Sequence, residues 1–286
     1  MFIVRPKVME PYLAAAVQMT STPDLSHNLT QAEALIQQAV ERGASLVTLP
    51  ENFSFLGPER EKLNQVKRIA ATTEEFLVKT AQRFGITLLG GGFPVPASAG
   101  KVYNVAALIG PHGEELGRYR KIHLFDVDLP DGITYRESDS VLPGDTIHLV
   151  RTEKLGALGL SVCYDLRFPE VYRALALQGA DVLLIPSAFT AYTGKDHWRV
   201  LLQARAIENT CYVLAPAQVG THYSRRHTYG HALVIDPWGN VLADAGDMPG
   251  VAVAQIDPKR LAQVRQQLPV LQHQRLEGSP MPPVKE

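Results

Sequence analysis

Almost wholly apolar runs alternate with amphipathic segments along the chain, and they predict strands and helices in alternation. The predicted buried strands are YLAAAVQMT (12–20), SLVTLPENF (45–53), ITLLGGGF (86–93), VYNVAALIG (102–110), ALGLSVCYD (157–165), DVLLIPSAF (181–189), CYVLAPAQVG (211–220), YGHALVIDPWG (229–239) and GVAVAQID (250–257). The predicted helices are DLSHNLTQAEALIQQAVERGA (24–44), a segment around TEEFLVKTAQRFG (73–85), PEVYRALALQGA (169–180), HWRVLLQARAIENT (197–210) and PKRLAQVRQQL (258–268). Gly43 suits the C-terminal cap of the first helix. In the fourth helix we expect four residues to face inward: Val200, Leu201, Ala204 and Ile207.

Strands that are apolar on both faces need cover on both faces. Some neighbouring strands are nevertheless joined by turns, as in GGGFPVPASAGKVYNVAALIG. This mixture predicts packed sheets with helices outside, and it argues against a doubly wound sheet or a barrel. Because no linker, repeat or low-complexity stretch interrupts the pattern, we expect one domain over residues 1–286, with a core at about 12–271 and a tail at 272–286 that has no periodicity.

Composition narrows the classes of function. The 286 residues are 45% hydrophobic and 20% charged with a net charge of −1, which argues against disorder and against a nucleic-acid or anionic-membrane partner. No apolar stretch approaches the roughly 20 residues that span a bilayer. Lys7, Glu10 and two prolines make the N-terminus a poor signal peptide, and Met1 and Met9 are both candidate starts. Two cysteines make no disulfide framework, so a cytoplasmic location is expected.

Cys163 lies in SVCYDLRFPE, between an apolar run and a helix start marked by Pro169 and Glu170. A position close to a helix N-terminus favours the thiolate, and the backbone N–H of Tyr164 would be free to donate to a developing oxyanion. A buried structural thiol fits the same pattern, so both alternatives remain open on this observation. Cys211, in TCYVLAP, has apolar neighbours and no helix start, and we interpret it as a core residue.

A nucleophilic cysteine needs a proton acceptor, and Glu51 is the best-placed candidate. It follows SLVTLP, where an open sheet presents its ligand crevice. We expect desolvation by Leu49, Phe53 and Phe55 to raise its pKa and make it a useful base. The alternative is a solvated acid at a strand end, which is common.

Lys121, in GRYRKIHLFDVD, is the candidate cation. It either belongs to a charged strand face with Arg118 and Arg120 or lies in the same crevice, where it would donate to the oxyanion. Glu137, in the polar segment YRESDSVLPGD, has no distinguishing feature of its own.

No metal or phosphate site is expected. His222, His227 and His231 are crowded in THYSRRHTYGH, but their spacing matches no zinc-binding pair. GGGF (90–93) follows a strand, but no helix start follows it, which argues against a phosphate-binding loop.

Three motifs taken together resemble the nitrilase superfamily of carbon–nitrogen hydrolases: LPENF with Glu51, YRKIHL with Lys121, and SVCYDLRFPE with Cys163. The similarity runs from about Leu13 to the neighbourhood of Leu271. It implies an α/β fold of the nitrilase type, an α-β-β-α sandwich with two packed sheets and helices outside, which forms a homodimer or a higher homo-oligomer.

The same resemblance implies a Glu51–Lys121–Cys163 triad, with Glu137 as an additional active-site glutamate. Glu51 takes the thiol proton, Cys163 attacks an amide carbonyl, and Lys121 with the Tyr164 N–H stabilises the oxyanion. A thioester forms and is then hydrolysed. The resemblance implies that no cofactor is required.

The sequence around these motifs favours one branch of the superfamily. Tyr164-Asp165 stands where true nitrile hydrolysers usually have Trp-Glu, which favours amidase chemistry. CYDLRFPE, HWRVLLQARAIENTCYV and RRHTYGHALVIDPWG most closely resemble the deaminated glutathione amidases. This implies a small-molecule substrate, 2-oxoglutaryl-Cys-Gly, that is cleaved to 2-oxoglutarate and Cys-Gly as metabolite repair.

A substrate with carboxylates needs cations in its pocket. The candidate substrate-binding residues are Arg167, Phe189, Lys195, His197, Arg199, Arg225 and Arg226, although a solvated surface cation remains the alternative for each charged one. Arg205 and Glu208 instead suggest a structural pair on one helix.

Other functions remain to be distinguished. An ω-amidase acting on 2-oxoglutaramate, or an enzyme for another small aliphatic amide or carbamoyl compound, shares much of the pattern. A catalytically silent binding subunit would not need the intact Glu51, Lys121 and Cys163. A class I glutaminase would have glycines beside its cysteine, which SVCY lacks.

Overall fold

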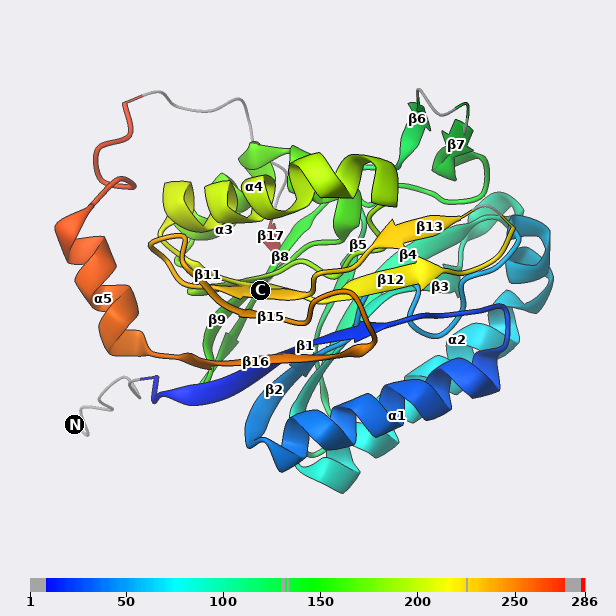
Figure 1. Ribbon diagram of the computed structural model, residues 1–286, viewed down its shortest axis with the longest axis horizontal. Helices are drawn as coiled ribbons and strands as arrows, with labels where there is room; N and C mark the ends of the chain where they lie inside the picture. Colours follow the sequence, from blue (N-terminus) through cyan, green and yellow to red (C-terminus); the bar gives the residue numbers. More distant parts are fainter. Residues whose placement is uncertain (1–8, 130–131, 133, 225, 276–283, 286) are drawn as a thin grey trace.

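The computed structural model describes residues 9–129, 132, 134–224, 226–275 and 284–285. Two mixed sheets pack face to face with helices on their outer faces, and the predicted α-β-β-α sandwich is confirmed (Figure 1). Helices α1 (Leu25–Glu41) and α2 (Glu59–Phe84) cover one sheet, and α3 (Pro169–Leu177) and α4 (Ala191–Asn209) cover the other (Figure 1). A fifth helix, α5 (Pro258–Gln267), lies at one end of the molecule (Figure 1).

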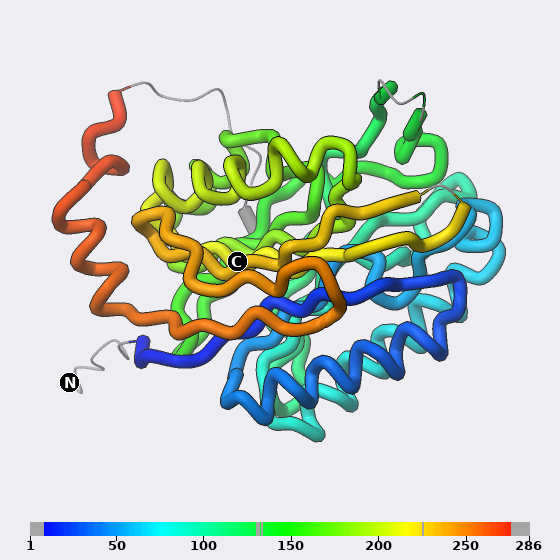
Figure 2. The backbone as a smooth tube through the Cα atoms, viewed as in Figure 1, coloured from blue at the N-terminus to red at the C-terminus, as the bar shows by residue number. Residues whose placement is uncertain are grey.

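The first sheet has the order β13-β12-β1-β2-β3-β4-β5, and β16 also pairs with β1. Figure 2 shows β1 and β16 side by side although they come from opposite ends of the chain. The strands are β1 (Tyr12–Met19), β2 (Ala44–Thr48), β3 (Thr87–Pro96), β4 (Val102–Ile109), β5 (Glu115–Arg120), β12 (Ala217–Thr221), β13 (His227–Tyr229) and β16 (Gly250–Ile256).

The second sheet has the order β15-β14-β11-β10-β9-β8-β17, and a separate hairpin is formed by β6 and β7. These strands are β6 (Asp126–Asp128), β7 (Thr134–Arg136), β8 (Ile147–Thr152), β9 (Gly156–Leu160), β10 (Val182–Leu184), β11 (Tyr212–Ala215), β14 (Leu233–Ile235), β15 (Val241–Asp244) and β17 (Val284–Lys285). Short 3₁₀ turns are η1 (Ser98–Gly100), η2 (Glu137–Asp139) and η3 (Cys163–Arg167).

One predicted strand, CYVLAPAQVG, is in fact two. β11 belongs to the second sheet and β12 to the first, and Pro216 separates them. Because proline lacks the N–H that a central strand needs, the ladder ends there and the chain crosses between the sheets.

The inward face predicted for the fourth helix is wrong. Helix α4 begins at Ala191, before the predicted start, and its buried face carries Trp198, Leu202 and Ala206. The Trp198 indole donates a 2.7 Å hydrogen bond to the His231 carbonyl, which fixes this face against the sheet. Two of the residues predicted to be buried are therefore exposed, Val200 by 65% and Ile207 by 49%, while Leu201 and Ala204 lie half-buried at the border.

Apolar side chains fill the spaces on both sides of the first sheet. One cluster lies between the two sheets and extends to α3 and α4, and it includes Cys163 and the predicted core residue Cys211. A second cluster packs the first sheet against α1 and α2. None of the described helices is both long enough and apolar enough to cross a bilayer.

Candidate active site

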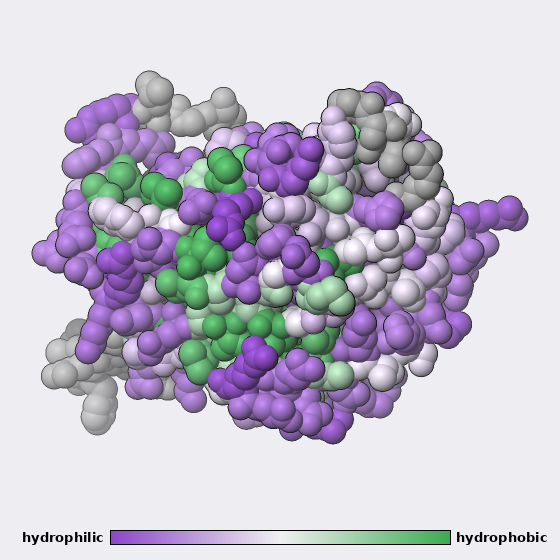
Figure 3. All heavy atoms as spheres, viewed as in Figure 1, coloured by the Kyte–Doolittle hydropathy of each residue, from purple (hydrophilic) through white to green (hydrophobic). Residues whose placement is uncertain are grey.

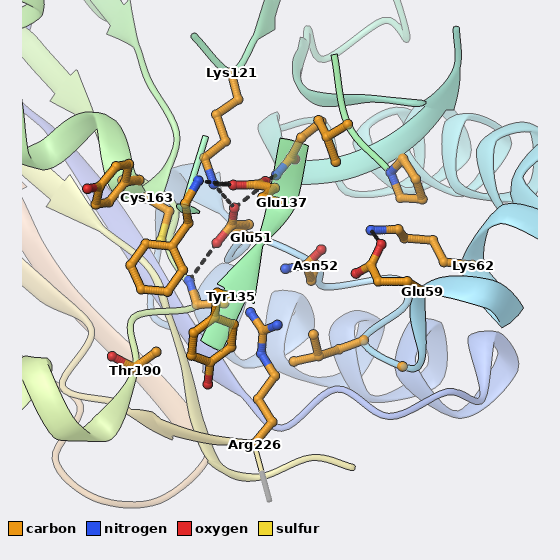
Figure 4. Close-up of a pocket in the computed structure, with 18 of the residues that line it drawn as sticks. Glu51, Asn52, Glu59, Lys62, Lys121, Tyr135, Glu137, Cys163, Thr190 and Arg226 are labelled. Atoms are coloured by element: carbon orange, nitrogen blue, oxygen red, sulfur yellow. Dashed lines mark hydrogen bonds and ion pairs between the residues drawn. The ribbon is translucent and has the colours of Figure 1, made fainter. Parts of the chain in front are cut away.

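A cavity of about 260 Å³ opens where strands of both sheets end (Figure 4). The first sheet supplies Glu51, just after β2, and Lys121, just after β5. The second sheet supplies Cys163, at the start of η3 after β9, and Glu137 begins η2 after the β6–β7 hairpin. These four residues, far apart in the sequence, line one small cavity.

Lys121 is the centre of a buried ion cluster. Its Nζ lies 2.9 Å from Glu51 Oε1 and 2.8 Å from Glu137 Oε2. The Phe125 N–H donates a 2.7 Å hydrogen bond to that same Glu137 oxygen. Burial alone would lower the pKa of Lys121, but the attraction of Glu137 and Glu51 outweighs it and holds the pKa well above its usual range. Lys121 is therefore held as a cation by its two carboxylate neighbours.

Glu51 is fixed by donors from both sheets. Its Oε1 accepts from Asn104 Nδ2 at 2.9 Å as well as from Lys121, and its Oε2 accepts from the Ala188 N–H at 3.0 Å. The segment at residues 49–51 packs closely against β3, and glycines in β3 leave the space for it. A Cβ on Gly91 would lie 2.2 Å from the Leu49 carbonyl oxygen. The GGGF motif therefore makes room for the segment that carries the glutamate.

The expectation of a raised Glu51 pKa is wrong. Burial does favour the protonated acid, but the charge of Lys121 and hydrogen bonds from Lys121 and the Cys163 thiol outweigh it, so the pKa lies below its ordinary value. Glu51 is thus a carboxylate at neutral pH, ready to accept a proton.

Cys163 is held in a strained backbone conformation, with φ +49°. Such a conformation costs a non-glycine residue of order 1–3 kcal/mol and persists only where the surroundings enforce it. The thiolate expected from the nearby helix start is not favoured here, because burial and then the charge of Glu51 raise the pKa of the thiol well above its usual range. The thiol is neutral beside an ionised carboxylate, which is an arrangement for general-base catalysis.

Asp165 links the turn that carries Cys163 to the segment that carries Lys121. Its fully buried carboxylate accepts from the Tyr119 hydroxyl at 2.7 Å, two residues before Lys121. It also accepts from the His123 N–H at 3.0 Å, two residues after Lys121, and lies 2.8 Å from His123 Nδ1. Its remaining bond, from the Val162 N–H at 2.9 Å, fixes the start of η3. The turn that carries Cys163 and the segment that carries Lys121 are thereby held in register.

A second anchor for η3 comes from α4. Arg205 donates to the Leu166 carbonyl at 2.7 Å and to Glu208 at 2.8 Å, so the expected structural pair exists and also supports the turn. Among the described residues, nothing accepts a hydrogen bond from the Tyr164 N–H, one residue after Cys163. That N–H remains a free donor for an oxyanion.

The predicted substrate-binding residues divide into two groups. Phe189 and Arg226 line the cavity. Arg167 does not, but its guanidinium lies 5.1 Å from the Phe189 ring centre and 3.4 Å from His197 Nδ1. Arg225 lies outside the described residues.

The structure does not bring Lys195, His197 or Arg199 into the cavity, and this corrects the prediction. All three lie on the exposed side of α4, because Trp198 occupies its inner side. Arg199 pairs with Asp244 at 2.7 Å.

Cys211 and His222 have structural contacts. The Cys211 thiol is fully buried and donates to the Ala180 and Asn209 carbonyls, as expected of a core residue. His222 contacts Ser21 O and Thr228 Oγ1, and burial lowers its pKa to about 4. Within the described ranges there is no group of residues that would hold a metal ion.

Comparison with known proteins places the chain in a family. Residues 13–266 match the model of the family described as "Carbon-nitrogen hydrolase". The chain belongs to the carbon–nitrogen hydrolase family. A protein named deaminated glutathione amidase from Synechocystis sp. (strain PCC 6803 / GT-S) is 65% identical over 93% of this hydrolase and 98% of its own length. A human protein named omega-amidase is 37% identical over 93% and 96%.

Among solved structures, the NitFhit protein of C. elegans superposes with a TM-score of 0.88 at 38% identity. The match covers 94% of this hydrolase but only 66% of that longer chain.

Sequence reasoning missed several residues that line this carbon–nitrogen hydrolase's cavity, among them Asn104, Glu59, Lys62 and Tyr135. It also missed Asp165, which is buried behind the turn that carries Cys163. An acid two residues after a candidate nucleophile was a usable signal for Asp165. Nothing in the sequence around Lys62 distinguishes it from other lysines on an amphipathic helix.

Proposed function

We propose that this carbon–nitrogen hydrolase is an amidase that hydrolyses deaminated glutathione to 2-oxoglutarate and Cys-Gly through a cysteine thioester. The convergence of Glu51, Lys121 and Cys163 in one cavity supports the chemistry. The 65% identity to the Synechocystis protein of that name supports the substrate. A cavity of about 260 Å³ suits a small molecule and not a polymer.

Acylation begins when the Glu51 carboxylate takes the thiol proton and the Cys163 sulfur attacks the amide carbonyl carbon. The carbonyl electron pair moves to oxygen, where the Lys121 ammonium and the Tyr164 N–H stabilise the negative charge. When the carbon–nitrogen bond breaks, the departing nitrogen takes the proton back from Glu51. The acyl group remains on sulfur as a thioester.

Deacylation uses the same groups. Glu51 takes a proton from water, the resulting hydroxide attacks the thioester, and the oxyanion forms at the same donors. Collapse expels the sulfur of Cys163, which regains its proton from Glu51. Glu137 touches the cation and not the reacting atoms, so we assign it a positioning role on Lys121.

Arg226 binds the carboxylate of the acyl group in this proposal. The Arg226 guanidinium lines the cavity 5.5 Å from the ring centre of Tyr135, and among the described residues nothing accepts a hydrogen bond from its buried Nε. Its charge contributes to the lowered pKa of both Glu51 and Glu59, which puts it between the two ends of the cavity. A guanidinium with an unused donor suits a carboxylate.

The substrate is tested by comparing initial rates on deaminated glutathione and on 2-oxoglutaramate. We expect a higher kcat/KM for deaminated glutathione, because the cavity extends well beyond the catalytic cluster (Figure 4). The second candidate is an ω-amidase, favoured by the 37% identical human protein. Substantially faster turnover of 2-oxoglutaramate would establish that candidate instead.

We also infer that two copies associate through α4 and the adjacent β14–β15 turn. Four large apolar side chains are exposed here, 44–65% each: Val200, Ile207, Trp238 and Leu242. The Gln203 side chain donates to the Gly239 carbonyl, so helix and turn form one surface. Apolar surface gathers on this face (Figure 3), and such a surface on an isolated monomer is unusual.

The dimer has a direct test. Val200→Glu places a charge on this surface and is expected to halve the mass measured by light scattering. Glu61→Gln, an exposed change on α2, is the matched control. An unchanged mass for Val200→Glu, or a monomeric wild-type protein, would contradict the interface.

We propose that the whole chain forms one carbon–nitrogen hydrolase domain, since the family match covers residues 13–266. Both cysteines are free thiols, which is compatible with the proposed cytoplasmic location.

A further inference from the structure

The active-site cavity has a second charged end, formed by the first turn of α2. Lys62 and Glu59 line the cavity there together with Leu56 and Gly57. In Figure 4, Cys163 lies at one side of the cavity, Asn52 in the middle, and Glu59 with Lys62 at the opposite side. The proposed mechanism leaves this end unassigned.

Lys62 is held in place as a cation. Its Nζ lies 2.6 Å from Glu59 Oε2, and only 12% of its side chain is exposed. The same glutamate oxygen accepts a 2.5 Å hydrogen bond from the Ser140 hydroxyl, which ties the pair to the wall of the cavity. An ammonium has three donors, so a contact with one carboxylate leaves the others for a ligand.

The chemistry of the two candidate substrates says what such a ligand is. Deaminated glutathione and 2-oxoglutaramate give the same 2-oxoglutaryl thioester on Cys163, so they share the acyl half of the site. They differ in the leaving group, which is Cys-Gly with a terminal carboxylate in one case and ammonia in the other. A residue that separates the two substrates therefore has to contact the leaving group.

We propose that Lys62, oriented by Glu59, binds the terminal carboxylate of the Cys-Gly leaving group and so determines specificity. The inference rests on the proposed function. The acyl carboxylate ends the acyl chain, on the opposite side of the scissile bond from the leaving group, and is assigned to the more central Arg226. The glycine carboxylate lies beyond a second amide bond and matches the more distant Lys62. The cavity therefore has one cation for each carboxylate of the substrate.

The test measures kcat/KM for both substrates in the wild type and in Lys62→Met, which keeps the length and the apolar stem of the side chain. We expect the ratio of kcat/KM for deaminated glutathione to that for 2-oxoglutaramate to fall about tenfold, mainly through KM, because one charge-assisted contact to a carboxylate is lost. Arg226→Met, in contrast, is expected to impair both substrates alike. Lys67→Met is the matched control, since Lys67 lies on the same helix, is exposed and does not line the cavity.

A change in the substrate provides a second measurement that needs no variant. The glycinamide analogue of deaminated glutathione lacks the terminal charge, and wild type is expected to hydrolyse it about tenfold less efficiently, with no further loss in Lys62→Met. An unchanged substrate ratio in Lys62→Met, or equal losses on both substrates, would overturn the assignment. Failure of the wild type to turn over deaminated glutathione at all would overturn the proposed function instead.

Discussion

Cys163→Ala is expected to abolish amide hydrolysis, by about 10⁴-fold or more in kcat/KM, because the proposed mechanism forms the acyl intermediate on the sulfur of Cys163. The fold should survive, since Ala fits the space of the thiol and the turn is held by Asp165 through bonds that do not involve sulfur. The measurements are product formation and mass spectrometry of the enzyme after incubation with substrate. We expect neither product nor an acyl adduct.

Cys211→Ala is the matched control for that variant. Cys211 is also a buried free thiol, but it packs in the core beside Ala180 and Asn209. Its replacement is expected to cost about 1 kcal/mol in the free energy of unfolding and to leave turnover in place. Turnover retained by Cys163→Ala, with Cys211→Ala equally active, would remove Cys163 from the mechanism.

The layers of the fold were predictable because they depend on patterns that are local in the sequence. Apolar runs such as YLAAAVQMT are buried on both faces wherever they lie, and the turn-linked strands of GGGFPVPASAGKVYNVAALIG exclude a purely doubly wound sheet. The crossing at Pro216 and the true inner face of α4 were not predictable in this way. Both depend on which surface of the folded protein the segment packs against. In α4 the face that contains Trp198 is buried, and the face predicted from the spacing of Val200 and Ile207 is exposed.

The predicted site residues also divide into those whose position follows from a local pattern and those whose position does not. Glu51, Lys121 and Cys163 each follow a strand, and strand ends of packed sheets meet at common edges, so their convergence follows from the topology. Lys195 and Arg199 were chosen for charge alone, and charge gives no direction on a helix whose inner face is unknown.

Electrostatics was the least predictable part of the site. Burial was expected to raise the pKa of Glu51, but the charge of Lys121 makes the net shift downward. The nearby helix start was expected to favour the thiolate of Cys163, but burial and the charge of Glu51 favour the neutral thiol. For Glu51 the deciding group is Lys121, and for Cys163 it is burial first and the charge of Glu51 second; both depend on parts of the chain distant in sequence. The consequence is chemical: the resting pair is carboxylate and thiol, and proton transfer accompanies attack.

Glu51→Gln is expected to slow acyl-enzyme formation from the amide by about 10³-fold or more, because no group remains to take the thiol proton and return it to the leaving nitrogen. The measurement is the rate of mass gain on the enzyme after mixing with deaminated glutathione.

Alkylation of Cys163 is the control, because it requires the thiolate but no proton acceptor in the transition state. The Glu51 charge raises the pKa of the thiol, so its removal lowers that pKa and increases the thiolate fraction at a given pH. Alkylation by iodoacetamide, measured at the same pH for both proteins, should therefore be as fast as in wild type or faster. Amide-derived mass gain at the wild-type rate would show that Glu51 is not the base, whereas a variant that neither acylates nor alkylates would show that the glutamate only supports the turn.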